Sequence, residues 1–521
     1  FYDSKLTIIC CFISAAIIGL LSKFLLRQHT YIFTFIYPLM TSRFEILHKD
    51  AAGRIGRLTT AHGVVETPTV MPVINPNIQT IKPSEMRDFG AQMLITNSYI
   101  IYRKEELREK ALKDGLHSLL DFDGPIMTDS GSFQLSVYGE VEVSNAQIVE
   151  FQQKIGSDIV VPLDIPTPPN VTREQAEAEL ETTIQRLKAA RELANGDMLI
   201  AGPVQGSSYL DLREQCAHTL SEVGFDLYPF GAVVPLMETY RYADLVDVII
   251  AAKKGLDPSA PVHLFGAGHP MMFALAVSLG CDLFDSAAYA LYAKDRRYIT
   301  TTGTYHLDQL QYLPCSCPVC VSHTAEQLKK ASNCQDLLAR HNLYVTFEEM
   351  RYVKQSIKEG NLLELVEQRC RAHPRLLSAL KQMYKYSDWL EMHDPASKST
   401  FFYCGPESSK RPEVLRFSRR LGRFSLKGKA LIRASPTRID SEFDHVLIFR
   451  PPFGAFPQEL SEIYPFNTES VHIPDYESLE EAYMNVLELI GLNPHVEFTF
   501  MIAERFDHPL VEELKQVATI I

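Results

Sequence analysis

The chain has 521 residues, of which 46% are hydrophobic and 22% charged, and its formal net charge is −13 at pH 7. This length is too great for one ordinary domain, so we expect two to four domains with globular cores. Ten cysteines, most of them scattered, argue against a disulfide framework and favour a reducing compartment. The negative charge excludes indiscriminate coating of nucleic acid, although it permits a local basic face.

The N-terminal segment is unusually apolar. Residues 6–26 contain few polar side chains and are long enough to span a bilayer. A membrane anchor, a secretory signal and spurious upstream translation are the three interpretations, and no small-residue cleavage site follows cleanly. Because a reducing compartment fits a cytosolic protein, we favour Met40 as the biological start, which makes residues 1–39 a doubtful extension of a cytoplasmic protein. The anchor interpretation stays open.

From residue 40 to about 345, short apolar runs alternate with amphipathic stretches. We expect strands at 92–96, 125–128, 159–163, 198–201, 232–235, 262–265 and 283–284. Helices are expected between them, for example at 172–194 and 243–254. Repeated β-then-α units of this length predict a parallel sheet, and seven or eight of them favour a closed (β/α)8 TIM barrel.

Polar residues fall at the ends of the predicted strands, where the catalytic groups of such barrels lie. Asp129, Asp164, Gln205 and Asp285 each follow an apolar run, and Gly231 precedes one. A single Asp in this position is more often a helix cap or a turn residue. Five coincidences instead indicate one site at one end of the barrel.

A compact cysteine motif follows the barrel. Cys315, Cys317 and Cys320 are followed 21 residues later by His341, and three thiolates with one imidazole are the donors of a closed tetrahedral zinc site. His341 alone would be a weak signal, because a histidine after a helical run is usually structural. Four protein donors leave no open position, so the sequence predicts a structural Zn²⁺.

The C-terminal part differs in charge. Residues 346–397 look helical and are expected to cover the flank of the barrel. Between Glu407 and Arg438 there are ten Lys or Arg against two Glu, which is either a solvated face or a surface for a phosphate backbone. The predicted organisation is a catalytic barrel at 40–397, with an inserted zinc subdomain at 315–341, and a small C-terminal α+β extension at 398–521.

Several motifs resemble the tRNA-guanine transglycosylases, in the same order from about Phe44 to His341. They are Asp129-Ser130-Gly131-Ser132-Phe133-Gln134, Pro162-Leu163-Asp164, Gly202-Pro203-Val204-Gln205-Gly206, Leu283-Phe284-Asp285 and the cysteine motif. The resemblance implies an enzyme that exchanges a guanine in tRNA for a 7-deazaguanine, on a (β/α)8 barrel with a structural zinc.

The resemblance also implies a role for each site residue. Asp285 matches the nucleophile of a covalent glycosyl-enzyme intermediate, and Asp129 matches the general acid/base that serves both half-reactions. Asp164 would accept from the N1–H and the exocyclic amine of guanine, Gln205 and the Gly231 amide would donate to its O6 atom, and Ser130 would add a polar contact. Phe133 and Phe265 match the aromatic pair that sandwiches the base.

The segment from Gly231 to Glu238 and the Ser132 variant are similar to the archaeal branch of the family. The bacterial branch has a Glu that helps bind an aminomethyl group, and Leu236 stands at that position here. A neutral nitrile therefore fits better, which implies exchange of guanine 15 in the D-arm for 7-cyano-7-deazaguanine (preQ0), an early step of archaeosine biosynthesis. The alternatives are a queuine- or preQ1-type enzyme at the anticodon, and a non-catalytic tRNA-binding subunit.

The resemblance extends to partners. Residues 401–408 look like the opening of the archaeal C-terminal extension, and the zinc subdomain is a dimer surface in this family, so we expect a homodimer that binds tRNA. Archaeal members usually end with an RNA-binding PUA module, and none is recognised before Ile521. We therefore expect either a separate PUA-containing partner or a protein that extends beyond Ile521.

Overall fold

The computed structural model describes residues 43–132, 143–194, 196–434 and 442–521, and Phe44–Ile521 form one compact unit. The extension 1–39, the stacking candidate Phe133 and the basic residue Arg438 lie outside the described residues. Within those ranges, no helix combines enough length and apolarity to span a membrane.

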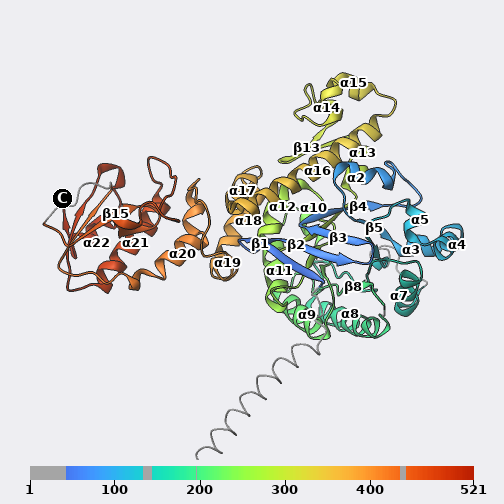
Figure 1. The fold of residues 1–521 in the computed structure, drawn as a ribbon, viewed down its shortest axis with the longest axis horizontal. Helices are drawn as coiled ribbons and strands as arrows, with labels where there is room; N and C mark the ends of the chain where they lie inside the picture. The colour runs from blue at the N-terminus through green and yellow to red at the C-terminus, as the bar shows by residue number, and fades with distance from the viewer. Residues whose placement is uncertain (1–42, 133–142, 195, 435–441) are drawn as a thin grey trace, which may run out of the picture. The chain divides into compact units, whose positions relative to one another are not determined.

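Eight parallel strands form the barrel, as predicted (Figure 1). In chain order they are β4 (Thr69–Ile74), β5 (Leu94–Asn97), β6 (Ile126–Asp129), β7 (Ile159–Val160), β8 (Leu199–Ile200), β9 (Tyr228–Phe230), β10 (Val262–Leu264) and β11 (Leu283–Ser286). β4 pairs with β11, and parallel bridges from Ala201 to Leu227 and from Val204 to Phe230 join β8 to β9. These contacts close the sheet into a ring.

Two strands differ from the sequence prediction. The predicted strand at 232–235 is wrong, because the strand is β9 and the chain then turns into helix α10 (Val234–Glu238). Pro235 lies in the first turn of α10, where a missing N–H costs no hydrogen bond. β4 has no counterpart among the predicted strands, although it is almost wholly buried.

Helices surround the strands. The expected helices at 172–194 and 243–254 are confirmed as α8 (Arg173–Leu193) and α11 (Tyr242–Gly255). The others in the ring include α2 (Met86–Phe89), α3 (Ser98–Arg103), α4 (Glu105–Asp114), α5 (Leu116–Leu120), α7 (Asn145–Lys154), α9 (Leu210–Val223), α12 (Phe273–Ser278) and α13 (Ala288–Lys294).

A three-stranded antiparallel sheet covers the N-terminal end of the barrel. It comprises β1 (Phe44–Asp50), β2 (Gly53–Thr60) and β3 (Gly63–Thr67). Phe44, Leu58 and Val65 of this sheet share a core with side chains inside the barrel. The covered end lies opposite the predicted site, because residues that precede the barrel strands are found there.

A buried carboxylate fastens this cover. Asp158, just before β7, accepts hydrogen bonds from the ring nitrogens of His62 and His117, at 3.0 Å each. It also accepts from the backbone amides of His62 and Ile126, at 2.9 Å each. The two imidazoles stack with their centroids 3.7 Å apart. Asp158 therefore joins the β2–β3 turn, α5 and the start of β6.

A small lobe is inserted between α13 and the long helix α16 (Cys334–Glu359). It contains β12 (Arg297–Thr300), β13 (Gly303–His306), α14 (Pro318–Ser322) and α15 (Ala325–Lys330). Figure 1 shows α14 and α15 at the far end of α16. The predicted helical flank follows as α17 (Leu362–Cys370), α18 (Pro374–Met383) and α19 (Ser387–His393).

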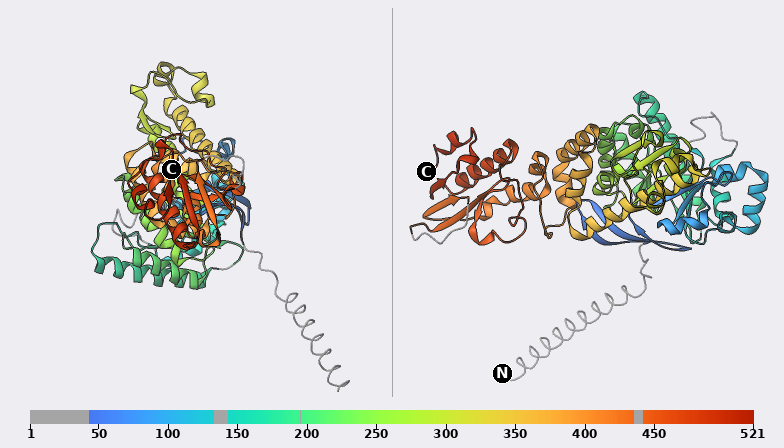
Figure 2. Two further views of the ribbon diagram at one scale, coloured as in Figure 1. Left: turned by 90° about the vertical axis from the view of Figure 1, so that its left-hand side faces the viewer. Right: turned by 90° about the horizontal axis from the view of Figure 1, so that it is seen from above.

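Beyond Phe401 the chain builds a second hydrophobic core. Its five-stranded sheet has the order β16-β15-β14-β17-β18, with helices along one side (Figure 2, right). The elements are α20 (Pro412–Ser418), β14 (Lys429–Arg433), β15 (His445–Arg450), β16 (Gly454–Pro457), α21 (Tyr476–Leu492), β17 (Glu497–Met501), α22 (Val511–Leu514) and β18 (Thr519–Ile520). We call this part the C-terminal module.

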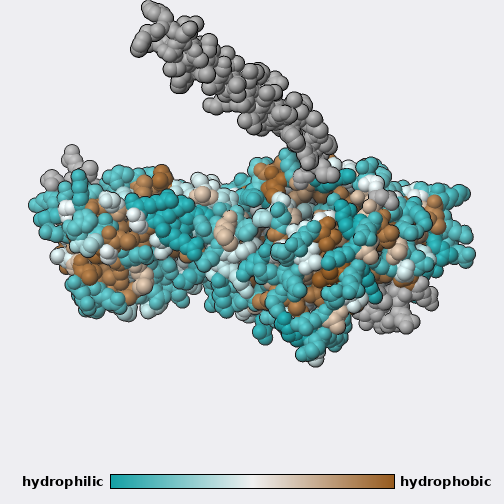
Figure 3. All heavy atoms as spheres, turned by 90° about the horizontal axis from the view of Figure 1, so that it is seen from below, coloured by the Kyte–Doolittle hydropathy of each residue, from teal (hydrophilic) through white to brown (hydrophobic). Residues whose placement is uncertain are grey.

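The face of the molecule in Figure 3 is mostly hydrophilic and carries several hydrophobic patches.

Buried ion pairs join the two cores. The Lys398 ammonium lies 2.7 Å from Asp50, 2.6 Å from Asp394 and 3.1 Å from Glu413. Arg411 is fully buried and pairs with Glu364 and Glu367 at 2.6 and 2.8 Å. Charges buried in this way need partners, because desolvation without a partner is costly.

Candidate active site and metal centre

The barrel brings the predicted polar residues to one end. Asp129 is the last residue of β6, Asp285 lies in β11, and Asp164 and Gln205 follow β7 and β8. The strands are parallel, so their C-terminal ends meet at one mouth of the ring (Figure 1).

Asp129 is a half-buried carboxyl whose pKa lies near neutral pH. Its Oδ2 accepts hydrogen bonds from Nδ2 of Asn97 at 2.9 Å and from the Gly131 amide at 3.3 Å. Burial, followed by the nearby charge of Asp164 and that of Asp285, raises the pKa of Asp129 to about 7. At neutral pH this carboxyl can therefore give a proton or take one.

Asp164 and Gln205 form a buried pair. Nε2 of Gln205 donates to Oδ2 of Asp164 at 2.6 Å, and the Ser132 hydroxyl accepts from the Asp164 amide at 3.0 Å. Burial raises the pKa of Asp164 against these stabilising hydrogen bonds. Oε1 of Gln205 is buried and has no partner in the described part of the chain. A ligand with an N–H group at this position would donate a hydrogen bond to this buried oxygen.

Gly231 lies directly beneath this pair. A Cβ atom there would overlap the side-chain nitrogen of Gln205, so the close approach requires glycine. The Gly231 amide donates to the Val204 carbonyl at 3.2 Å, within the closure of the barrel. Its predicted contact with the O6 atom of guanine stays a prediction, because that amide already has an acceptor.

Ser130 is fully buried, and its hydroxyl donates to the Pro162 carbonyl at 3.1 Å. It also lies 3.0 Å from the hydroxyl of Ser132. The side chain thus links the ends of β6 and β7, and a direct contact with a base likewise stays a prediction.

Asp285 is held by one of its two oxygens. Oδ1 accepts from Nε2 of His263 at 2.8 Å and from the Gly266 amide at 2.6 Å. Within the described ranges, Oδ2 receives no hydrogen bond. Phe265, the predicted stacking residue, is half-buried, and its ring lies 4.3 Å from that of His263. The arrangement orients the carboxylate and leaves Oδ2 for another contact.

The four predicted metal donors converge in the inserted lobe. The donor atoms of Cys315, Cys317, Cys320 and His341 all lie within 4.8 Å of one another. Nδ1 of His341 is 3.4 Å from the Cys317 sulfur and 3.3 Å from the Cys320 sulfur. A tetrahedral zinc site would separate such atoms by about 3.6 Å.

The environment of His341 also suits metal binding. Its Nε2 donates to the Ile299 carbonyl at 2.9 Å, which leaves the Nδ1 lone pair directed at the sulfurs. The ring of Tyr298 stacks on the imidazole at 3.6 Å. These residues can therefore bind one metal ion with four protein donors.

The described part of the basic stretch 407–438 is not a uniform solvated face. Arg411 and Arg416 are buried and pair with carboxylates of the flanking helices, so the hypothesis of a continuous phosphate-binding surface is wrong for them. Lys410 and Arg419 are also paired, with Glu481 and Asp388. Arg420 and Arg423 are exposed and show no ion pair with the residues that the structure describes.

Two contact residues escaped the sequence analysis. His263 interrupts an apolar strand, and a polar side chain in such a strand was the available signal. Asn97 ends β5, and the strand-end rule that selected Asp129 would also have found it. Both hold a carboxylate of the site by a side-chain hydrogen bond.

The sequence motifs predict a barrel with carboxylates at its mouth and a Cys₃His lobe. The structure shows this architecture, with the lobe inserted before α16. The model of a protein family described as queuine tRNA-ribosyltransferase matches residues 50–375. The chain belongs to this family, the tRNA-guanine transglycosylases, and the resemblance inferred from the motifs is confirmed.

Individual relatives extend the match beyond the barrel. The chain is 67% identical to the tRNA-guanine(15) transglycosylase of Methanosarcina acetivorans over 482 residues, which are 92% of this chain and 98% of that protein. Proteins with the same name from Haloferax volcanii and Archaeoglobus fulgidus are 52% and 49% identical. They align with 88% and 89% of this chain, and with 90% and 96% of their own lengths.

Proposed function

We propose that the chain is a tRNA-guanine(15) transglycosylase that replaces guanine 15 in the D-arm of tRNA with preQ0, as in archaeosine biosynthesis. The observation that carries the proposal is the pair of carboxylates at the barrel mouth. Asp129 has its pKa raised to about 7, and Asp285 keeps one oxygen free of hydrogen bonds in the described structure. Relatives of this name align with nearly the whole described chain.

In the first half-reaction, Oδ2 of Asp285 attacks C1′ of the nucleotide and the bond to guanine breaks, which inverts the configuration. Asp129 gives its proton to the departing guanine. The incoming base then returns a proton to Asp129, attacks C1′ and releases Asp285, which inverts the configuration again. His263 and Gly266 hold Oδ1 throughout, so the nucleophile needs no rearrangement between the steps.

Base recognition falls to Asp164, Gln205 and Gly231 in this proposal. Asp164 accepts from the N–H edge of guanine, and the orphaned Oε1 of Gln205 offers a second acceptor. Leu236 is 1% exposed and packs into the core, so no carboxylate is offered for a cationic substituent. This supports the neutral nitrile of preQ0 over an aminomethyl group.

A base-exchange assay tests the function. The full-length protein is given a tRNA transcript with labelled guanine, preQ0 or preQ1, with and without an added PUA-containing protein. We expect incorporation of preQ0, and none into a transcript with adenine at position 15. The proposal is overturned if none of the three bases is exchanged, whether or not the PUA-containing protein is added. Preferential use of preQ1 would support the anticodon-type alternative.

The nucleophile has its own test. Asp285→Ala should abolish the covalent tRNA adduct that wild-type protein traps in denaturing gels, whereas Asp295→Ala, an exposed control on the following loop, should leave it. An adduct in the Asp285→Ala variant would refute the assignment.

We also propose that the bound metal is Zn²⁺ and that it only braces the lobe, because four protein donors leave no position for substrate. Tyr305, Tyr312 and Val321 expose apolar surface on this lobe, which supports a homodimer contact there. Light scattering of wild type and of a Tyr312→Glu variant would test the dimer.

The chain is proposed to be cytoplasmic, with a catalytic part at 40–397 and a tRNA-contacting extension at 398–521.

A further inference from the structure

The C-terminal module contains a cavity of about 200 Å³, separate from the catalytic carboxylates. Its walls come from the residue after β14, from the end of β15 and from the 3-10 turn Glu504–Phe506 that follows β17. β14, β15 and β17 are parallel neighbours. The carboxyl edge of such a sheet is the place where open α/β folds bind ligands.

The cavity carries positive charge that the carboxylates of Glu462 and Glu469 offset only in part, without direct ion pairs. Arg450 and Arg505 both line it, and neither forms an ion pair with any described carboxylate, unlike Arg411 and Arg416. Arg450 donates to the Phe466 carbonyl, and burial lowers the pKa of its guanidinium. An anion in the cavity would offset that desolvation. In a chain of net charge −13, two unpaired guanidinium groups at one cavity need an explanation.

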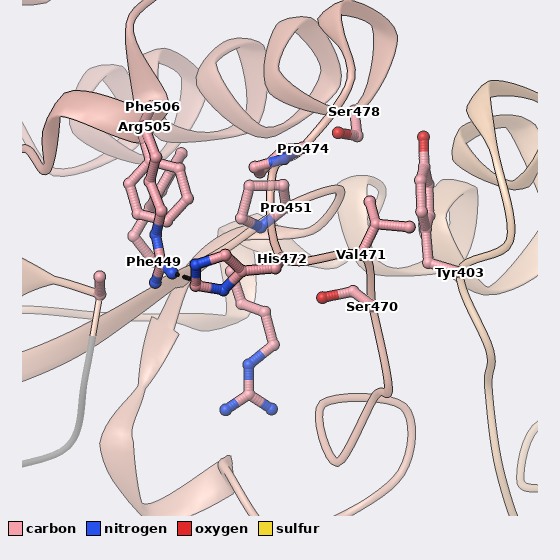
Figure 4. Close-up of a pocket in the computed structure, with 12 residues that line it drawn as sticks. Tyr403, Phe449, Pro451, Ser470, Val471, His472, Pro474, Ser478, Arg505 and Phe506 are labelled. Atoms are coloured by element: carbon pink, nitrogen blue, oxygen red, sulfur yellow. Dashed lines mark hydrogen bonds between the residues drawn. The ribbon is translucent and has the colours of Figure 1, made fainter.

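The remaining donors are arranged around the same space. Nη1 of Arg505 lies 3.2 Å from Nδ1 of His472, so this imidazole accepts the bond and presents Nε2–H as a further donor. Figure 4 shows Arg505 and His472 at one side of the cavity and the hydroxyl groups of Tyr403 and Ser478 at the other. The cavity is thus cationic at one end and rich in hydroxyl groups at the other.

The polar groups are held in place by their surroundings. The Tyr403 hydroxyl lies 2.8 Å from both oxygens of Asp475 and donates its one proton to this carboxylate. Asp475 also caps α21 by accepting from the Ser478 amide. The Arg505 guanidinium lies 4.8 Å above the Phe506 ring. A preformed polar site of this kind loses little entropy when it binds a ligand.

We propose that this cavity binds one phosphate and its ribose in an unpaired stretch of the RNA substrate, with the phosphate between Arg450 and Arg505. Guanidinium groups match phosphate oxygens in geometry, and the hydroxyl-rich end suits a 2′-OH. The volume is below the roughly 300 Å³ of sites that enclose whole small molecules, which favours a segment of a longer chain over a free nucleotide. The RNA is the tRNA of the proposed function, so the inference rests on that function for its source.

Binding is measured by fluorescence anisotropy, without any catalytic step, using a labelled tRNA transcript and a labelled single-stranded RNA hexamer. Arg505→Ala and Arg450→Gln should each weaken binding of both probes about tenfold. Each should also reduce the slope of log K against log salt by about 0.7. Lys515→Ala is the matched control, since Lys515 lies in the same module, outside the cavity, and pairs with Glu512.

Competition separates the possible ligands. Unlabelled hexamer should displace the probe, whereas AMP and inorganic phosphate should do so only at concentrations at least a hundredfold higher. The inference is overturned if both arginine variants bind RNA as the wild type does while retaining its melting temperature. It is also overturned if AMP competes as well as the hexamer. Base exchange is measured in parallel to separate failure of this inference from failure of the proposed function. If only the proposed function fails, no base is exchanged but RNA binding still depends on the two arginines.

Discussion

At the residue scale, Asp129 and Asp285 have the same functional group in different surroundings. Each carboxylate accepts two hydrogen bonds on one oxygen, but burial and the neighbouring charges of Asp164 and Asp285 raise the pKa of Asp129 to about 7. Like charges and burial disfavour ionisation, and donors favour it. These surroundings support the proposed assignment of Asp129 as the acid and of Asp285 as the nucleophile.

This separation predicts a pH dependence. A pKa of Asp129 raised to about 7 means that the group is protonated below that pH and loses the proton above it. If it protonates guanine, adduct formation under single-turnover conditions should fall about tenfold per pH unit above 7. Asp129→Asn should be slower than the wild type by at least about 10² below pH 7, and the gap should narrow as the pH rises above 7. A wild-type rate that stays constant from pH 6 to pH 9 would contradict the role.

At the scale of elements, Asp158 fastens the N-terminal sheet to the barrel. Burial would raise the pKa of Asp158, but hydrogen bonds from His117, the Ile126 amide and His62 outweigh this and lower it. A lowered pKa contributes stability that is present above the unfolded value near 4 and is lost as the pH falls further. We expect Asp158→Asn to cost about 1.5–3 kcal/mol at pH 7.

The difference in free energy of unfolding between wild type and Asp158→Asn should shrink below pH 4, because protonated Asp158 also loses its charge-assisted bonds. Thermal unfolding followed by circular dichroism at pH 7 and at about pH 2.5 checks this. An equal loss at both pH values would show that the carboxylate charge is irrelevant.

The metal lobe supports a second prediction at this scale. Cys317→Ser should lower the bound metal from one ion per chain and reduce the melting temperature, because an ion held by the four donors would join α14 to α16. Activity per folded molecule should change little. Elemental analysis, with Cys334→Ser as the control outside the donor set, provides the measurement. Loss of activity at full metal content would contradict a purely structural role.

The sequence was sufficient for the elements that carry strong local signals. The strands that carry Asp129 and Asp285 are short apolar runs, and the spacing of the cysteine motif is itself typical of a metal site. β9 was misplaced because Ala232-Val233-Val234 is as apolar as the strand, whereas Pro229 makes the true strand look like a turn. The His263–Asp285 and Asn97–Asp129 contacts depend on which strands become neighbours, and local pattern does not give that pairing.

At the scale of the whole molecule, charges buried between the two cores decide how they join. Lys398 compensates Asp394 and Glu413, which are close to it in the chain, and Asp50, which belongs to the first strand. Burial acts against Glu413 ionising, but Lys398 and Arg411 lower its pKa to about 2. No sequence motif announces this cluster, since its members have no common spacing.

Lys398→Met should therefore destabilise the protein by about 3–5 kcal/mol at pH 7, because three carboxylates lose their shared cation. Their protonation at lower pH relieves the repulsion, so the deficit should decrease towards pH 5. Lys410→Met removes an exposed pair with Glu481 and should cost less than about 1 kcal/mol. Urea unfolding of both variants at the two pH values is the test, and equal losses in both variants would contradict the prediction.

The same cluster has a consequence for synthesis on the ribosome. Asp50 ends the first strand, yet its cation is added about 350 residues later, which at typical translation rates takes roughly 20–70 s. Throughout that interval the carboxylate stays hydrated, and the turn between β1 and β2 cannot reach its final environment. The sheet that covers the barrel is thus completed only after a segment about 350 residues further along the chain has been synthesised.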